Sequence, residues 1–352
     1  MKENLSQRWP LPSKPRPIVI IGAGGIVSDA HLPAYEQAGF TVTGIFDLNK
    51  EQAEKTAEQW NIPTVYSTLE EATQSSDVVY DLALPPIAVP ATLEVLPDNV
   101  PVLIQKPMGL NLEEARTTKQ ICHRKNFVAA VNFQLRYAPM MLALRDAVQK
   151  GYIGELLDIE LHLNISTPWE MFPYLKSMDR IELLVHSIHY IDLIRSIAGE
   201  PTGVLCRSMA DPRSEDFKQT RTSVIFDYPY PLRGLMSINH NHDFGRRAQD
   251  ALFRFEGTKG CVTVKMGVSL DYPKGEPDEF WIATGGSEWQ PVPLEGNWFP
   301  EAFIGTMSNL QRFANGEDTV LNTSVDDAFN TMAVVEACFE SNATPSHPIA
   351  TS

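Results

Sequence analysis

The sequence predicts an α/β protein with an N-terminal doubly wound parallel sheet and a C-terminal α/β domain built on a large, mostly antiparallel sheet. Three observations lead to this fold class. The chain has 352 residues, which correspond to about two domains. Strand-like and helix-like patterns alternate over residues 18–137, as in right-handed βαβ units. After residue 138 polar and apolar residues alternate, which is typical of antiparallel strands with one exposed face.

The first half begins with the run IVIIG at 18–22, a buried strand that ends at glycines. A helix follows to Gln37, and Gly39 occupies the usual C-cap position. The remaining apolar runs predict strands at 41–46, 64–66, 77–84, 100–105 and 127–133. Helices are expected between them at 49–60, 68–75, 87–96 and 112–125.

The second half begins with a helix at 138–149. Alternating runs then predict strands at 156–165, 202–209, 221–228, 232–242, 250–256 and 260–266. Apolar helices are expected at 180–198, 301–315 and 324–341. We therefore expect an extended, proline-containing arm at 1–16, a first domain at 17–137 and a second domain at 138–352, whose last helices can pack back on the first.

The composition excludes several classes of partner. The chain has 44 acidic and 29 basic residues, a net charge of −15 that repels nucleic acids and anionic membranes. No apolar run approaches the roughly 18–20 residues of a membrane span, and the start of the chain lacks the apolar stretch of a secretory signal. Its four cysteines form no CxxC pair, which favours a reducing compartment. We therefore expect a cytoplasmic protein.

The amphipathic strands of the second half predict an exposed sheet face. Such a face usually finds a partner. We expect a homodimer or homotetramer through this sheet, and a single-chain mass in light scattering would contradict that expectation.

A glycine-rich motif, Gly22-Ala23-Gly24-Gly25-Ile26-Val27, follows the first strand and opens the first helix. Gly22 allows a tight turn, and Gly24 allows the backbone to approach a pyrophosphate at the positive end of the helix. The third position of this dinucleotide fingerprint is Val27 rather than Gly or Ala. A plain glycine-rich turn is the structural alternative.

Asp47 ends the second strand, 25 residues after Gly22. A carboxylate at this point accepts hydrogen bonds from both adenosine ribose hydroxyls and repels a 2′-phosphate, which favours NAD over NADP. Lys50 lies nearby and leaves NADP open. An aspartate that caps the second helix is the structural alternative.

Gln105-Lys106-Pro107 follows the strand at 100–105, and the carboxyl end of a parallel strand is where such sheets bind ligands. With this segment the chain resembles the Gfo/Idh/MocA family, the glucose–fructose oxidoreductase and inositol dehydrogenase type of enzyme. The segments that carry the resemblance span nearly the whole chain in family order: VIIGAGGIVSDAHLPAY (19–35), IFDLNKEQA (45–53), LIQKPMGLNLEEA (103–115), VNFQLRYAP (131–139), GYIGEL (151–156) and HSIHYIDLIRSIAGEP (186–201).

The resemblance implies a Rossmann domain that binds NAD(P), followed by an α/β domain that binds substrate. It also implies oxidation of a secondary alcohol of a sugar or cyclitol. The family lysine corresponds to Lys106 and the family active-site histidine to His189. The expected cofactor site consists of Gly22, Gly24, Gly25, Ile26, Asp47, Pro85, Gln105 and Lys106.

The chain departs from the family pattern at three positions. The usual glutamate before the lysine is Gln105, and a common histidine is replaced by Val89. The aspartate often found four residues before the histidine is Val185, so the usual Lys–Asp–His set is incomplete. Glu182, seven residues before His189, is a candidate to reach the same helix face.

Two closely spaced histidine pairs are further candidates, His186/His189 on a helix and His240/His242 on a strand. Each spacing puts both side chains on one face. Three interpretations stay open: catalysis and substrate binding with His189 as general base, a Zn²⁺-type site, and structural hydrogen bonding. We assign His189 to catalysis and no residue to a metal.

The expected substrate site consists of Asn132, Arg136, Trp169, His186, His240 and His242. Arg136 suits a carboxylate or a polyol oxygen, with an interdomain salt bridge as the alternative. Trp169 suits stacking on a sugar ring, although a core aromatic explains it equally well.

The leading hypothesis is an NAD(P)-dependent oxidoreductase that acts on a small polyol or sugar. Lys106 bonds the reacting hydroxyl and His189 takes its proton as hydride leaves for the nicotinamide. One alternative is a non-enzymatic NAD(P)-binding sensor on the same scaffold, motivated by Val185. The other is a metal-assisted lyase or hydrolase, motivated by the paired histidines.

Overall fold

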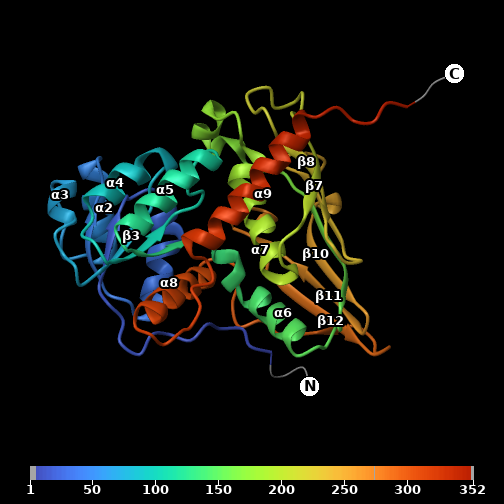
Figure 1. Ribbon diagram of the computed structural model, residues 1–352, viewed down its shortest axis with the longest axis horizontal. Helices are drawn as coiled ribbons and strands as arrows, with labels where there is room; N and C mark the ends of the chain where they lie inside the picture. The colour runs from blue at the N-terminus through green and yellow to red at the C-terminus, as the bar shows by residue number, and fades with distance from the viewer. Residues whose placement is uncertain (1–4, 273, 350–352) are drawn as a thin grey trace. The chain divides into compact units, whose positions relative to one another are not determined.

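The computed structural model describes residues 5–272 and 274–349 (Figure 1). The chain forms two compact units. The first consists of the residues up to Asp146 together with Leu294–Met332. The second consists of Ala147–Pro293 together with the residues from Ala333 onward. Helix α8 (Glu301–Ala314) is thus part of the first unit, and the boundary falls within α9 (Val325–Ala343).

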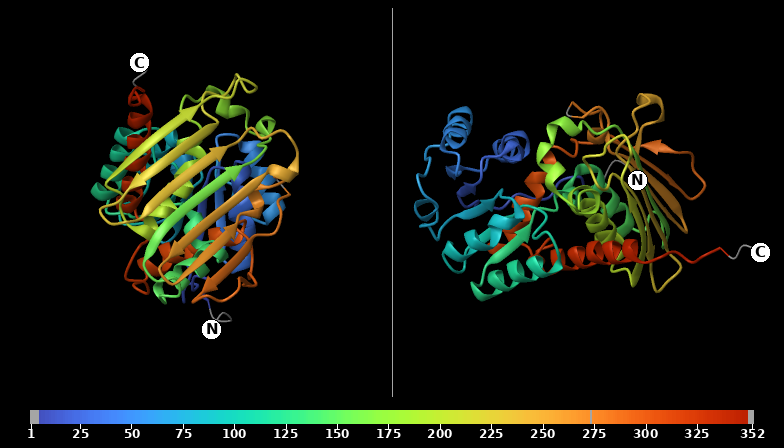
Figure 2. Two further views of the ribbon diagram at one scale, coloured as in Figure 1. Left: turned by 90° about the vertical axis from the view of Figure 1, so that its right-hand side faces the viewer. Right: turned by 90° about the horizontal axis from the view of Figure 1, so that it is seen from above.

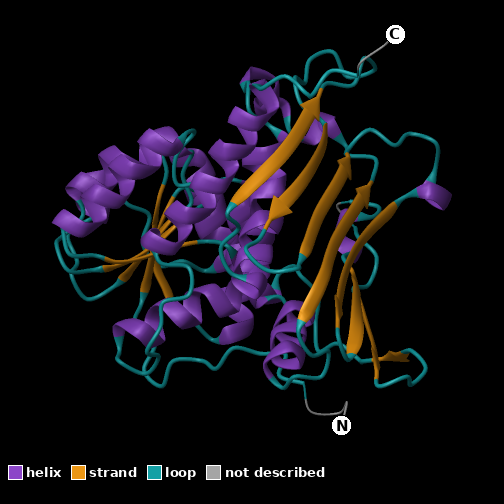
Figure 3. Cartoon of the chain, turned by 45° about the vertical axis from the view of Figure 1, so that its right-hand side comes forward, coloured by secondary structure: helices purple, strands orange, loops and turns teal. Residues whose placement is uncertain are grey.

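A parallel sheet of five strands forms the centre of the first unit, in the order β2-β1-β3-β4-β5. Helices cover both of its faces (Figure 3), so the apolar strands β1, β3 and β4 are buried along their full length. The expected doubly wound parallel sheet is therefore confirmed. The strands are β1 (Ile18–Ile21), β2 (Val42–Phe46), β3 (Val79–Leu82), β4 (Pro101–Ile104) and β5 (Val128–Val131).

The expectation of a strand at 64–66 is wrong, because Val65 makes only an isolated bridge with Ile45. The segment connects α2 to α3 and is too short to extend its pairing with β2. The first unit's helices otherwise follow the expected pattern. They are α1 (Leu32–Ala38), α2 (Lys50–Trp60), α3 (Leu69–Ala72), α4 (Val89–Val95), α5 (Leu112–Arg124), α6 (Pro139–Gln149) and α8.

Local signals in the sequence explain where these helices begin and end. The side chain of Asn49 accepts a hydrogen bond from the backbone N of Gln52 and caps α2. Asn111 caps α5 in the same way. Gly39 ends α1 in the left-handed region with φ 70°, as its position predicts. A π-helical segment, Val27–His31, precedes α1 and was not expected.

The second unit contains an eight-stranded sheet in the order β13-β12-β11-β10-β6-β9-β8-β7, seen face on in Figure 2. All of its pairs are antiparallel except β6 with β9, so the mostly antiparallel sheet is confirmed. Two strands, β12 and β13, were not expected. The strands are β6 (Leu156–Asn164), β7 (Gly203–Met209), β8 (Arg221–Asp227), β9 (Arg233–Asn239), β10 (Asp250–Gly257), β11 (Gly260–Lys265), β12 (Glu279–Thr284) and β13 (Gln290–Pro291).

One face of this sheet is buried and the other is not. Along β6, for example, Ile159, Leu161 and Leu163 are buried, whereas the intervening residues are at least partly exposed. Helix α7 (Ile188–Ala198) also belongs to this unit and follows a second π-helical segment, Glu182–Ser187. Within the described parts of the chain, no helix is long and apolar enough to cross a membrane.

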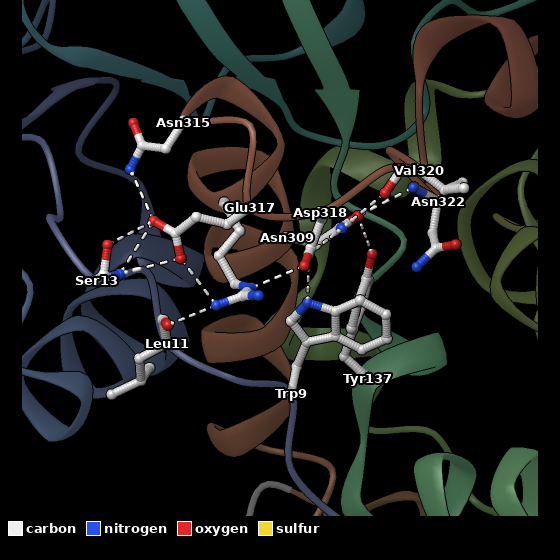
Figure 4. A network of polar contacts seen from close by, with 11 residues as sticks. Trp9, Leu11, Ser13, Tyr137, Asn309, Asn315, Glu317, Asp318, Val320 and Asn322 are labelled. Atoms are coloured by element: carbon white, nitrogen blue, oxygen red, sulfur yellow. Dashed lines mark hydrogen bonds and ion pairs between the residues drawn. The ribbon is translucent and has the colours of Figure 1, made fainter.

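The N-terminal arm binds the first unit through polar contacts, shown in Figure 4. The hydroxyl of Ser13 donates to the carboxylate of Glu317, with 2.9 Å between the oxygens. The indole Nε1 of Trp9 donates to Oδ2 of Asp318 at 3.0 Å, and the Trp9 ring packs edge-on against Tyr137. Arg312 donates to both carboxylates and to the carbonyl of Leu11. The arm therefore joins residues about 300 positions apart in the sequence.

We predict that Trp9→Phe lowers the free energy of unfolding by about 1.5 kcal/mol, because it keeps an aromatic six-membered ring and removes the indole N–H that donates to the Asp318 carboxylate. Denaturant unfolding measures this change. Arg8→Ala is the control, since its ion pair with Glu295 lies at the surface and contributes less than about 0.5 kcal/mol. Equal effects of the two substitutions would contradict the prediction.

Candidate active site

The glycine loop lies between β1 and the first π segment. The backbone N of Gly22 donates to the carbonyl of Phe46 at 2.7 Å, which ties the loop to the end of β2. Gly22 has a φ of 111°, and a Cβ there would lie 2.4 Å from the carbonyl oxygen of Ala83. A Cβ at Gly24 would meet nothing within 4 Å. The fold itself therefore requires glycine at 22, whereas the open side of Gly24 is available to a ligand.

The Asp47 carboxylate lies against the same loop. Its Oδ2 accepts a hydrogen bond from the backbone N of Ala23 at 2.7 Å, and its Oδ1 accepts one from the N of Asn49 at 2.7 Å. The residue that caps α2 is Asn49, not Asp47. The structure thus brings Gly22, Gly24 and Asp47 together at one edge of the sheet, as the dinucleotide interpretation expects.

The other expected cofactor residues lie directly after this loop or after strands β3 and β4 of the same sheet. Gly25 and Ile26 begin the helical segment after it. Pro85 is exposed and follows β3, the strand beside β1. Lys106 follows β4, and burial lowers the pKa of its amine to about 8. A lysine with this pKa changes charge near neutral pH and is suited to proton chemistry.

A hydrogen-bonded chain, buried except at Gln105, joins five side chains of the first unit, and sequence reasoning missed it. Asp81 accepts hydrogen bonds from Tyr35 and from His31, which also contacts Asn132. Asn132 in turn donates to Oε1 of Gln105 at 3.0 Å. The one signal in the sequence was an aspartate within the apolar run DVVYDLAL.

Arg136 is buried and its guanidinium is bound within the first unit. It donates to the carbonyl of Asn322 at 2.7 Å and to Oδ2 of Asp327 at 2.5 Å. These contacts fix the start of α9 beside the short helix Gln134–Tyr137. Binding of substrate by Arg136 stays a prediction.

In the second unit the π-helical turn places a buried carboxylate beside a hydroxyl. A π-helix has i to i+5 hydrogen bonds, so Glu182 and Ser187 share a face. The Ser187 hydroxyl donates to Oε1 of Glu182 at 2.6 Å. Glu182 is fully buried, and its Oε2 has no hydrogen-bond partner among the described residues.

His240 lies opposite this carboxylate. Its Nε2 is 3.6 Å from Oε1 of Glu182, and its Nδ1 is 2.8 Å from the hydroxyl oxygen of Thr167. The rings of His186 and Trp169 lie 4.5 and 5.8 Å from the His240 ring, measured between centroids. Three of the expected substrate residues, Trp169, His186 and His240, are thus brought together.

The remaining histidines are placed separately. His189 is buried on α7, and the ring of His242 lies 5.9 Å from that of Phe244. Lys106 belongs to the first unit and His189 to the second, so their assignment to one reacting hydroxyl stays a prediction. Within residues 5–272 and 274–349 no group of three or more His, Cys, Asp or Glu side chains could hold a metal ion.

Comparison with known proteins agrees with this arrangement. The chain is 26% identical over 261 residues to trans-1,2-dihydrobenzene-1,2-diol dehydrogenase of Mus musculus, covering 70% of this chain and 73% of that protein. It is 22% identical over 333 residues to D-apiose dehydrogenase of Paraburkholderia graminis, covering 91% and 86%.

Solved structures share the fold. Levoglucosan dehydrogenase in complex with NADH and levoglucosan superposes with a TM-score of 0.77 at 18% identity, covering 94% of this chain and 98% of that one. An oxidoreductase from Agrobacterium radiobacter in complex with NAD⁺, L-tartaric acid and magnesium gives 0.76 at 19% identity, covering 94% and 97%.

Two family models together match most of the chain. The model of an oxidoreductase family with an NAD-binding Rossmann fold matches residues 16–133, and that of the family's C-terminal alpha/beta domain matches residues 145–351. The glycine loop, Asp47 and Lys106 lie in the first match, and the cluster around His240 lies in the second. The chain therefore belongs to the Gfo/Idh/MocA family of NAD-dependent oxidoreductases.

Proposed function

We propose that this oxidoreductase oxidises a secondary alcohol of a sugar-like or cyclitol-like substrate. The observation that carries the proposal is Lys106, a lysine of lowered pKa at the carboxyl end of β4, on the NAD-binding domain. The relatives support this class of substrate, since D-apiose and a cyclic diol are named as substrates of two of them.

The described residues fit NAD. The open space beside Gly24 admits the pyrophosphate, and Asp47 offers a carboxylate to the ribose. When bound, the nicotinamide supplies the acceptor for the hydride that leaves the substrate carbon. Lys106 in its ammonium form donates to the reacting oxygen and stabilises the developing alkoxide. His189 takes the hydroxyl proton as general base.

The cluster in the second unit supports a hydroxyl-rich substrate. Oε2 of Glu182 and Nε2 of His240 are buried polar atoms without a hydrogen-bond partner among the described residues, and such atoms cost free energy unless a ligand or water bonds them. A substrate hydroxyl can donate to Oε2 of Glu182, and it can either accept from or donate to Nε2 of His240. The Trp169 indole lies beside them and is stacked on Phe217, with 4.4 Å between the ring centroids. Aromatic faces of this kind suit contact with a sugar ring.

The alternatives have less support. The relatives named above are dehydrogenases, which disfavours a non-enzymatic sensor. A metal-assisted lyase or hydrolase has no set of three ligating side chains among the described residues. The homo-oligomer stays a prediction, supported by exposed apolar side chains on the outer strand faces such as Leu205, Ile225 and Trp281.

The two glycines predict different defects. Gly24→Ala leaves the free energy of unfolding within about 0.5 kcal/mol of the natural protein, because its Cβ enters open space. It lowers NADH affinity at least about tenfold, because the methyl group occupies the approach to the pyrophosphate. Gly22→Ala is the comparison and loses at least about 2 kcal/mol through strain and the clash with Ala83. Denaturant unfolding and NADH fluorescence measure both, and unchanged NADH affinity in Gly24→Ala would contradict the assignment.

We expect NADH to bind more tightly than NADPH, because the Asp47 carboxylate repels a 2′-phosphate. Asp47→Ala narrows the ratio of the two affinities about tenfold or more, since it removes that charge. The ratio is measured by fluorescence titration with each cofactor. Both cofactors use the same loop, so general damage to the loop lowers both affinities and leaves their ratio unchanged. Comparable binding of NADH and NADPH to the natural protein would overturn the role of Asp47.

Lys106→Ala should lower turnover of a sugar or cyclitol about 100- to 10,000-fold and leave NADH binding nearly intact. In the natural enzyme kcat/KM should fall as the pH rises through about 8. Below this pKa the amine is the ammonium that stabilises the alkoxide, and above it the charge is lost. Lys106→Arg is the control, because its residual activity should lack this fall. Unchanged turnover in Lys106→Ala would refute the role.

A further inference from the structure

Asp81 lies in β3, between β1 and β4 in the middle of the parallel sheet, and its side chain is fully buried. A carboxylate in such a place is costly unless hydrogen bonds compensate it. Its Oδ2 accepts two, from Nδ1 of His31 at 2.6 Å and from the hydroxyl of Tyr35 at 2.7 Å. Burial and Asp81 raise the pKa of Tyr35, so this phenol stays protonated and donates.

The polar contacts continue from His31 to Asn132 and Gln105. The carboxylate oxygen of Asp81 accepts, and Nδ1 of His31 donates to it. Nε2 of the same ring lies 3.3 Å from Nδ2 of Asn132. Nδ2 of Asn132 also donates to Oε1 of Gln105 at 3.0 Å. One series of polar contacts thus runs from Asp81 to Gln105.

This chain joins the segments that border the NAD site. His31 ends the π segment that follows the glycine loop. Asp81 is one residue from the end of β3, and the carbonyl of Ala83 just beyond it lies against Gly22. Gln105 directly precedes Lys106 in the sequence. A rearrangement of any member is therefore transmitted to the turn that carries the lysine.

We propose that Asp81 and His31 are positioning residues that hold the Gln105–Lys106 turn in place behind the cofactor site. Neither touches substrate; they act on Lys106 through Asn132 and Gln105. The inference rests on the proposed role of Lys106. It predicts that breaking this series of hydrogen bonds loosens the turn and lets water reach the amine of Lys106. The pKa of that amine then rises toward the value of an ordinary lysine.

The test compares two phenylalanine substitutions that each remove one hydrogen bond to the same oxygen of Asp81. His31→Phe also cuts the path to Asn132 and Gln105, whereas Tyr35→Phe leaves that path whole. The readout is competitive acetylation of the intact protein with acetic anhydride across a pH series, followed by peptide mass spectrometry. Exposed Lys50 serves as the internal reference.

We expect the Lys106 midpoint to rise by at least about one pH unit in His31→Phe and to stay at the natural value in Tyr35→Phe. Similar midpoints in all three proteins, or equal shifts in both variants, would overturn the proposal, since the histidine would then serve stability alone. If His31→Phe does not fold, Gln105→Met cuts the same chain at its partly exposed end and must raise the midpoint likewise. An unchanged midpoint in that variant would also overturn it.

The double variant His31→Phe/Gln105→Met should shift the midpoint no further than either single change, because both act through one path. Additive shifts of the Lys106 midpoint would show that the two residues do not act through one hydrogen-bonded path. Acetylation needs neither NAD nor substrate. If the natural protein oxidises no sugar or cyclitol, the proposed function fails. The labelling then still tests whether the hydrogen bonds from Asp81 to Gln105 affect Lys106.

Discussion

The parallel direction of the five strands is the constraint on which the chemistry of the first unit depends. Because neighbouring strands run the same way, the segments that follow them meet at one edge of the sheet. Gly22 follows β1, Asp47 follows β2 and Lys106 follows β4. Short contacts then fix the edge, notably Gly22 with Phe46 and with Ala83. No long loop is needed to assemble the site, which explains why short motifs in the sequence could indicate it.

The sequence predicted what periodicity and local motifs determine, and missed what depends on distant partners. Buried β-branched runs and alternating runs indicated most strands correctly, and capping residues indicated where helices begin and end. The strand at 64–66 failed because this short segment pairs with β2 only through the single bridge of Val65 with Ile45. Strands β12 and β13 lie among turn-forming residues that hid them. The contact of Asp81 with His31 spans 50 residues, and neither residue has a local pattern that reveals the other.

Two π-helical segments occur where the sequence indicated function, one after the glycine loop and one before His189. Such turns widen the helix and change which residues share a face. Each segment contributes to a buried carboxylate: His31 from the first segment donates to Asp81, and Ser187 in the second donates to Glu182. An α-helical reading of the spacing would place Glu182 beside His186 rather than beside Ser187. The irregular turns therefore determine which polar side chains are paired in both units.

The N-terminal arm has a consequence for how the protein is made. Trp9 and Ser13 bind Asp318 and Glu317, so the first unit is closed by contacts between residues from opposite ends of the chain. During synthesis the β-strands of this unit emerge first, but α8 and the residues after it emerge only after the second sheet. The first unit therefore lacks α8 and the contacts of its arm until the whole second sheet has been translated. Its exposed apolar surface during that interval is what a chaperone, or a neighbouring nascent chain, would meet.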